Sequence, residues 1–196
     1  MIIDFARSAT EDKVMDPNLI RKIAAASCAL ASAALSPSGL AQTDPLAVNY
    51  VIAGERLHTA GQPDSTQLAT VADRGFELVI NLAPPTSQNA IDTEGQLVAE
   101  TGVSYLNIPV DWRNPGYSDF ELFSGVLNQS GDRQVLVHCM LNYRASMFTF
   151  LYRVVHEQTP AAEAYEAVAQ VWEPEDQWVA FGQMVLDRHD IDFELP

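Results

Sequence analysis

Apolar runs of strand length alternate along this chain with longer patterns of helical period. Runs at residues 76–82, 103–108 and 134–138 are mostly apolar, as in strands buried on both faces. Two shorter runs, at 48–52 and 54–60, predict a pair of strands around a turn. Helical patterns are predicted over these ranges: 64–74, 92–101, 118–127, 143–155, 160–172 and a last stretch around 178–185. This order predicts an α/β fold in three layers, a parallel sheet with helices on both faces.

Helix starts are marked by short polar signals. Asp64 followed by Gln67, and Ser118 followed by Glu121, have the spacing of capping boxes. Thr159 precedes a proline and is expected to cap the helix that begins at residue 160.

The N-terminal segment has the pattern of a secretory signal peptide. The basic pair Arg21-Lys22 precedes a small-residue apolar run at 23–35, and a small-residue exit follows. The run is too short to span a bilayer core of about 30 Å. We therefore expect residues 1–42 to be a signal peptide with an N-terminal extension, Met15 to be a possible true start, and residues 43–196 to form the mature domain.

Cys28 falls within the signal and Cys139 does not. An exported chain with one thiol has no internal disulfide, and an exposed lone thiol is a liability in an oxidising compartment. This raises the expectation that Cys139 has a function.

Three polar features fall at the carboxyl edge of the predicted sheet, where ligands of such folds bind. They are Asn81, the loop at 109–116 and Cys139, each of which ends or follows a predicted strand. We expect them to lie near one another.

Cys139 stands between a strand and a helix, with Arg144 in the same turn. Free N–H groups and the helix dipole at such a turn favour an anion and the thiolate form. Cys139 is therefore a candidate nucleophile, Arg144 a candidate oxyanion ligand and Asp111 a candidate general acid. The side chain of His138 should point away from that of Cys139, so its expected role is to support the turn, or simply to fill the core.

The motif Val137-His-Cys-X4-Arg-Ala-Ser146 resembles the signature loop of cysteine-dependent phosphatases. Together with Ala60-Gly-Gln-Pro63, Val79-Ile-Asn-Leu82 and Ile108-Pro-Val-Asp-Trp112, it is similar to the bacterial beta-lactamase-hydrolase-like, tyrosine-phosphatase-like family. The resemblance implies a phosphatase-like α/β fold. It also implies that Cys139 and Arg144 act as the catalytic pair, with Asp111 as the loop aspartate. For a bacterial protein, the predicted signal peptide leads us to expect export to the periplasm.

The turn differs from that of tyrosine phosphatases in length. Four residues separate its cysteine and arginine, as in rhodanese-type sulfurtransferases, whereas tyrosine phosphatases have five. The turn also lacks glycine, and Asn142 is the residue best suited to a left-handed backbone in its place. The candidate anion-binding residues are those of the turn and helix start: Met140, Leu141, Asn142, Tyr143, Ala145 and Ser146.

The chain carries a formal net charge of −15, which disfavours nucleic acid and anionic lipid as partners. Its histidines are scattered, so neither a metal site nor a cofactor is expected. Three functions remain open. The first is hydrolysis of a phosphorylated small molecule or phosphoprotein through a phosphocysteine. The second is sulfur transfer through a persulfide on Cys139, and the third is binding of an anion or a protein without catalysis.

Overall fold

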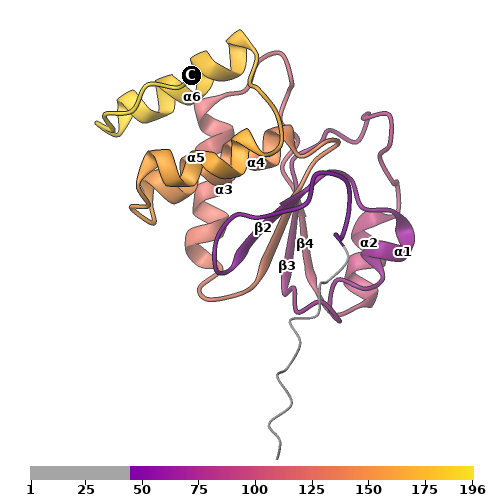
Figure 1. The fold of residues 1–196 in the computed structure, drawn as a ribbon. Coiled ribbons are helices and arrows are strands. Elements are labelled where there is room, and N and C mark those ends of the chain that lie inside the picture. Colours follow the sequence, from indigo (N-terminus) through magenta and orange to yellow (C-terminus); the bar gives the residue numbers. More distant parts are fainter. Residues whose placement is uncertain (1–44) are drawn as a thin grey trace, which may run out of the picture. The chain divides into compact units, whose positions relative to one another are not determined.

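The computed structural model describes residues 45–196, so the predicted signal peptide and start site lie outside the described residues. Five strands and six helices follow one another in this range (Figure 1). In chain order they are β1 (Val51–Ile52), β2 (Leu57–Ala60), α1 (Ser65–Leu68), β3 (Leu78–Asn81), α2 (Glu94–Glu100), β4 (Ser104–Asn107), α3 (Tyr117–Gln129), β5 (Val135–His138), α4 (Tyr143–Val155), α5 (Ala161–Ala169) and α6 (Asp176–Arg188).

The five strands form one sheet in the order β1-β2-β5-β3-β4. The last four are parallel, and β1 pairs antiparallel with β2, as expected of two strands around a turn. The predicted α/β class is confirmed, with a mixed sheet in place of a purely parallel one. In the register of β5 with its neighbours, His138 lies opposite Ala60 of β2 and Asn81 of β3. The carboxyl ends of three strands therefore meet beside Cys139.

Both faces of the sheet are covered, as the apolar runs predicted. Alternate strand residues belong to different cores: Val135 and Val137 face α3–α6, whereas Leu136 faces α1 and α2. Figure 1 shows α3–α6 on one side of the sheet and α1 and α2 on the other. This alternation also sends the side chains of His138 and Cys139 to opposite faces.

Helix α4 is the central helix of the larger layer. Ten of its thirteen residues are buried, because it lies between the sheet and the helices around it. Its N-terminus is the point at which the cysteine turn ends.

Only one of the predicted helix starts is in place. Asp64 and Gln67 form the expected capping box, with hydrogen bonds of 2.8 Å in both directions. The box predicted at Ser118 is wrong, because α3 begins earlier and Asp119 accepts the Gly116 N–H at 3.0 Å. The cap predicted at Thr159 is also wrong by one residue, since Pro160 occupies that position.

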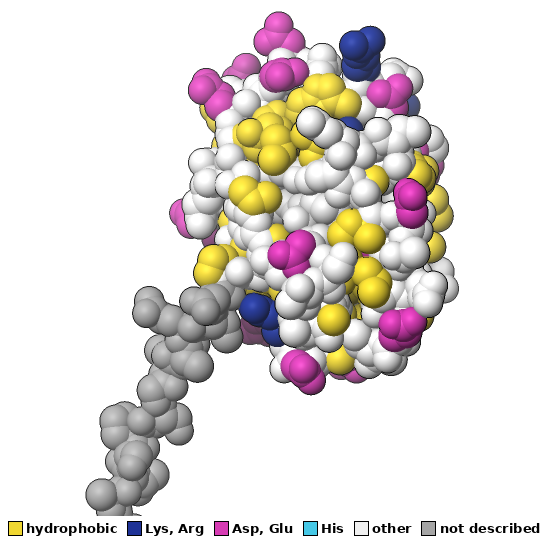
Figure 2. Space-filling model, turned by 90° about the vertical axis from the view of Figure 1, so that its right-hand side faces the viewer, with side chains coloured by type: hydrophobic (Ala, Val, Ile, Leu, Met, Phe, Trp, Pro, Cys, Tyr) yellow, Lys and Arg dark blue, Asp and Glu magenta, His cyan; other side chains and the backbone are white. Residues whose placement is uncertain are grey.

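Helix α1 is shorter than predicted, because regular hydrogen bonding ends at Leu68 and turns continue to Gly75. Among residues 45–196, no helix has the length and apolar character that a bilayer crossing requires. On the face drawn in Figure 2, acidic side chains are dispersed among apolar and neutral ones, in keeping with the acidic composition.

Candidate active site

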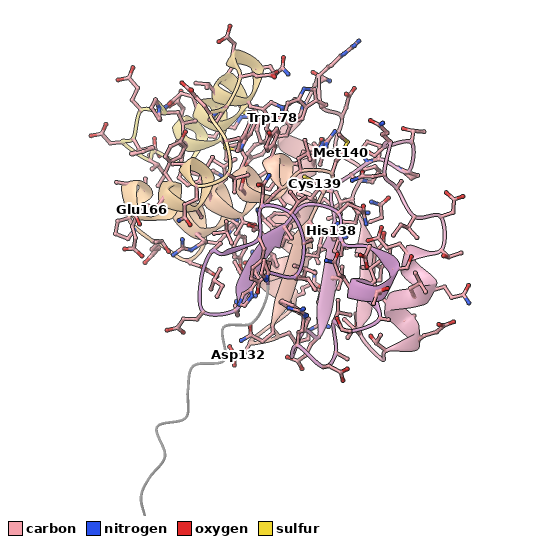
Figure 3. The ribbon with its side chains drawn as sticks, turned by 45° about the vertical axis from the view of Figure 1, so that its right-hand side comes forward. Asp132, His138, Cys139, Met140, Glu166 and Trp178 are labelled. Carbon is pink, nitrogen blue, oxygen red and sulfur yellow. The ribbon has the colours of Figure 1, made fainter. Side chains whose placement is uncertain are left out.

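Cys139 directly follows β5, and its turn is held by backbone hydrogen bonds on both sides. Its N–H donates to Ala60 O at 3.2 Å, and the Gln62 N–H donates to Met140 O at 3.1 Å. On the β3 side, the Leu82 N–H donates to His138 O at 2.8 Å. In Figure 3, Cys139 lies between His138 and Met140 at one end of the sheet, and Asp132 lies at the other. Neighbouring strands thus fix the position of Cys139.

Asn142 gives the turn its left-handed residue, as expected, with φ 71° and ψ 0°. Its side chain stabilises this conformation, because Nδ2 donates to Asn49 O at 2.5 Å and to Thr59 Oγ1 at 2.9 Å. A glycine would permit the same backbone but could not make these hydrogen bonds. Asn142 therefore shapes the turn and does not line the pocket described below.

The backbone amides that follow Cys139 are available to a ligand. Within residues 45–196 no acceptor takes the N–H groups of Met140, Leu141, Tyr143, Arg144 and Ala145. The last three belong to the first turn of α4, where the helix dipole adds partial positive charge. Unsatisfied donors at the start of a buried helix are the expected feature of an anion site.

A pocket of about 230 Å³ opens over the turn. Its lining residues come from the turn and from the loop after β4: Trp112, Cys139, Met140, Leu141, Tyr143 and Arg144. Cys139 lines it with none of its surface exposed to solvent, so a reagent reaches the thiol only as neighbouring side chains shift. The walls are largely apolar, and Arg144 is the one charged side chain among them.

Arg144 is held in a fixed orientation and is 8% exposed. Its Nε donates to Val110 O at 3.0 Å, and its guanidinium carbon lies 5.3 Å from the ring centre of Trp112. The two Nη groups have no acceptor among the described residues, so they remain able to hold two oxygens of an anion.

Aromatic side chains support this arrangement. The rings of Trp112 and Trp178 pack with their centres 5.1 Å apart, and Trp178 Nε1 donates to Trp112 O at 3.2 Å. Tyr143 stacks on Trp172 with ring centres 4.6 Å apart. Trp178 is fully buried, and the sequence does not single out Trp112 as a site residue. Its position one residue after Asp111 was the available signal.

Four of the predicted site residues lie outside the pocket lining besides Asn142. Asp111 is exposed, and its Oδ1 accepts the Arg113 N–H at 2.9 Å. The Ser146 hydroxyl donates to Tyr143 O at 3.1 Å, and the Ser146 N–H donates to Asn142 O at 2.8 Å. Both groups of Ser146 are therefore engaged within the start of α4. Ala145 is buried and offers only its amide, and His138 lies on the far face of the sheet.

Behind the turn lies a polar cluster that the sequence did not indicate. His138 Nε2 is 2.6 Å from Oε1 of Glu94, and both side chains are buried. The ring N–H is not directed along this line, so the two atoms make a close contact without an aligned hydrogen bond. Gln62 and Asn81 each donate to Glu94 Oε2 at 3.1 Å. Nothing in the sequence distinguishes Glu94 from the other acids nearby.

Tyr105 borders the same cluster and a second pocket of about 460 Å³, which Glu94 and Asn81 also line. Burial raises the pKa of Tyr105, and the Glu94 carboxylate raises it further, while the hydrogen bond from Asn81 acts in the opposite direction. No group of three His, Cys, Asp or Glu side chains in the described part of the chain is arranged to hold a metal ion.

No family model matches the chain. A solved DUF442 candidate phosphatase from Shewanella putrefaciens CN-32 is 34% identical, and the match covers 72% of this chain and 91% of that one, with a TM-score of 0.67. The chain belongs to this DUF442 family of phosphatase-like proteins. The resemblance drawn from its motifs is thereby confirmed.

One further relative and one protein of the same fold are similar to this DUF442 chain. The beta-lactamase hydrolase-like protein of Xylella fastidiosa strain Temecula1 is 31% identical over 104 residues, 52% of this chain. The chain thus spans only 24% of the length of that curated relative. TpbA of P. aeruginosa shares the fold at 16% identity, with a TM-score of 0.56 over 74% of this chain and 87% of its own.

Gly61 is a position at which the turn tolerates no side chain. A Cβ there would overlap Val48 Cγ1 and lie 3.0 Å from Met140 O and 3.1 Å from Val48 O. We expect Gly61→Ala to lower the free energy of unfolding by about 1–3 kcal/mol, the usual cost of overpacking. Urea denaturation measures this change.

The double variant Gly61→Ala/Val48→Ala should recover only part of the loss, because both backbone oxygens remain close. Gly125→Ala is the matched control, since a Cβ at Gly125 meets nothing within 4 Å and alanine favours its helix. Full recovery in the double variant would show that the backbone approach is unimportant.

Proposed function

We propose that this DUF442 domain is a cysteine-dependent hydrolase that cleaves a phosphomonoester through a phosphocysteine intermediate. The observation that carries the proposal is that Cys139 and Arg144 line one pocket, in a turn whose amides lack acceptors. The Shewanella putrefaciens relative is itself described as a candidate phosphatase, which adds support from the family. The substrate class is a phosphorylated small molecule or phosphoprotein.

The proposed reaction has two displacement steps. First, the Cys139 thiolate attacks phosphorus, the ester P–O bond breaks and the leaving oxygen takes up a proton. Water then attacks the phosphocysteine, the S–P bond breaks, and inorganic phosphate leaves with the thiolate restored. Arg144 and the free amides stabilise the negative charge of the transferring phosphoryl group in both steps.

Asp111 is the proposed proton donor in the first step and acceptor in the second. Its carboxylate is exposed and bonded to the Arg113 N–H, so the 109–116 loop must turn it toward the pocket when substrate binds. Loop closure of this kind is common in enzymes that exclude water during reaction.

The pocket limits what can reach the thiol. Its volume of about 230 Å³ and its walls of Trp112 and Tyr143 suit a phosphate carried on a compact or flat group. For comparison, TpbA has been solved with phosphotyrosine and PTPMT1 with PI(5)P. We propose a phosphate on a small aromatic group as the first substrate to test.

Cys139→Ser should abolish turnover of an aryl phosphate by removing the nucleophile. Arg144→Lys should lower kcat/KM by about a hundredfold or more, because a lysine cannot provide the paired Nη donors. Arg133→Lys is the matched control, since Arg133 precedes β5 at the other end of the strand. Steady-state kinetics measure the three variants, and turnover that survives in Cys139→Ser would refute the phosphocysteine.

Asp111→Asn tests the proton donor through its dependence on the leaving group. We expect kcat for an alkyl phosphate to fall by about 10²–10⁴, the usual contribution of general acid catalysis, and kcat for a nitrophenyl phosphate to fall much less. Equal losses for both substrates would assign Asp111 a role in the shape of the loop. Asp132→Asn, at the far end of the sheet, is the control.

A rhodanese-like sulfurtransferase is the second candidate, favoured by the four-residue spacing and by the apolar walls of the pocket. In that case incubation with thiosulfate adds one sulfur atom to Cys139, which mass spectrometry detects, and cyanide removes it. Stabilisation by phosphate without turnover of any substrate would instead favour a binding module.

We also propose that the domain works outside the cytoplasm, in the bacterial periplasm, after removal of residues 1–42. The support is the basic and apolar pattern before residue 42. N-terminal sequencing of the protein secreted by a bacterial host should find a start near residue 42 or 43. An intact start at Met1 or Met15 would refute export by cleavage.

A further inference from the structure

Glu94 is a buried carboxylate outside the pocket that contacts three elements at once. It is 3% exposed and begins α2. One oxygen lies 2.6 Å from His138 Nε2 at the end of β5, and the other accepts from Gln62 after β2 and Asn81 at the end of β3. The ends of three neighbouring parallel strands are therefore tied to a single side chain.

Burial of a charged group is costly unless donors replace the lost water. Two side-chain amides donate to Glu94 Oε2 and compensate part of this cost, while Oε1 has His138 Nε2 as its close neighbour at 2.6 Å. Loss of one partner would leave the carboxylate or the imidazole uncompensated. The cluster is for this reason a rigid arrangement rather than an adaptable one.

Two routes connect Glu94 with the cysteine turn. The first passes through His138, which is the residue before Cys139 and whose Nδ1 has no other partner in the described part of the chain. The second passes through Gln62, whose side chain binds Glu94 while its backbone N–H binds Met140 O, the residue after Cys139. The two routes reach the chain on both sides of the thiol.

We propose that Glu94 is a positioning residue, which holds Cys139 in the geometry of attack through His138 and Gln62. The inference rests on the proposed role of Cys139 as the nucleophile. Glu94 does not touch the pocket over the turn, so its effect reaches the reaction only through the backbone on either side of Cys139.

Glu94→Gln is the principal variant, because it keeps the shape and removes the charge. Glu100→Gln is the matched control on the same helix, where the exposed carboxylate accepts a hydrogen bond from Gln96 Nε2 at 2.9 Å. His138→Asn and the double variant Glu94→Gln/His138→Asn complete a double-mutant cycle. All variants are made in the full chain and compared at a temperature at which circular dichroism shows them folded.

Two readouts separate this inference from the proposed function. Aryl phosphate kinetics give kcat and KM, whereas the rate of iodoacetamide labelling of the Cys139 peptide, followed by mass spectrometry, needs no enzymatic activity. A displaced nucleophile lowers kcat and changes the labelling rate, while KM stays near the wild-type value. If the wild type has no phosphatase activity, the labelling rates still test Glu94.

We expect Glu94→Gln to lower kcat by about ten- to a hundredfold, the scale of a small misplacement of a reacting group, and to change the labelling rate by a similar factor. Glu100→Gln should match the wild type in both. In the His138→Asn background, Glu94→Gln should change kcat and the labelling rate much less, because the contact between Glu94 and His138 is already lost.

Wild-type labelling and kcat in Glu94→Gln would overturn the proposal. Effects of the two single variants that multiply in the double variant would also overturn the route through His138. If Glu94→Gln does not fold, His138→Asn carries the test alone, and an unchanged labelling rate in that variant refutes the inference.

Discussion

One buried carboxylate with three neighbours connects the ends of three strands on one side of the site. Parallel strands end at a common edge, and backbone hydrogen bonds fix the main chain just beyond it but not the side chains. Glu94 supplies that constraint by binding the side chains of His138, Asn81 and Gln62, which extend from three adjacent strands. The family motifs around these residues are explained by this contact: each provides one partner of the same side chain.

The opposite layer fixes the other half of the turn. Arg144 binds Val110 O and packs on Trp112, and Trp178 in turn binds Trp112 O. The remaining motif, residues 108–112, therefore holds the Arg144 side chain in place. Glu94 of α2 contacts His138 and Gln62, which flank Cys139. Val110 and Trp112, in the loop after β4, hold Arg144. The turn lies between two rigid layers, which is the condition for preorganised anion binding.

The order of strands and helices, the two-sided core, the edge at which the site lies and the left-handed Asn142 could all be predicted, because each follows from local pattern or backbone preference. Exact helix starts could not, as the cap near Gly116 shows, because Asp119 and Glu121 each offer a capping box with a different first residue. Glu94 and Trp112 could not be singled out either. Their roles arise from residues distant in sequence, and Glu94 resembles other acids near α2 until the sheet brings His138 against it.

The proposed anionic substrate would approach this protein against a net charge of −15, so attraction would have to come from the site itself. The positive contributions there are the Nη groups of Arg144 and the free amides at the start of α4. Both lie beside apolar walls, where weak competition from water strengthens each interaction. Glu94 lies across the sheet from the pocket, and two amides donate to its Oε2, so the proposed positioning acid is kept apart from the proposed anion site.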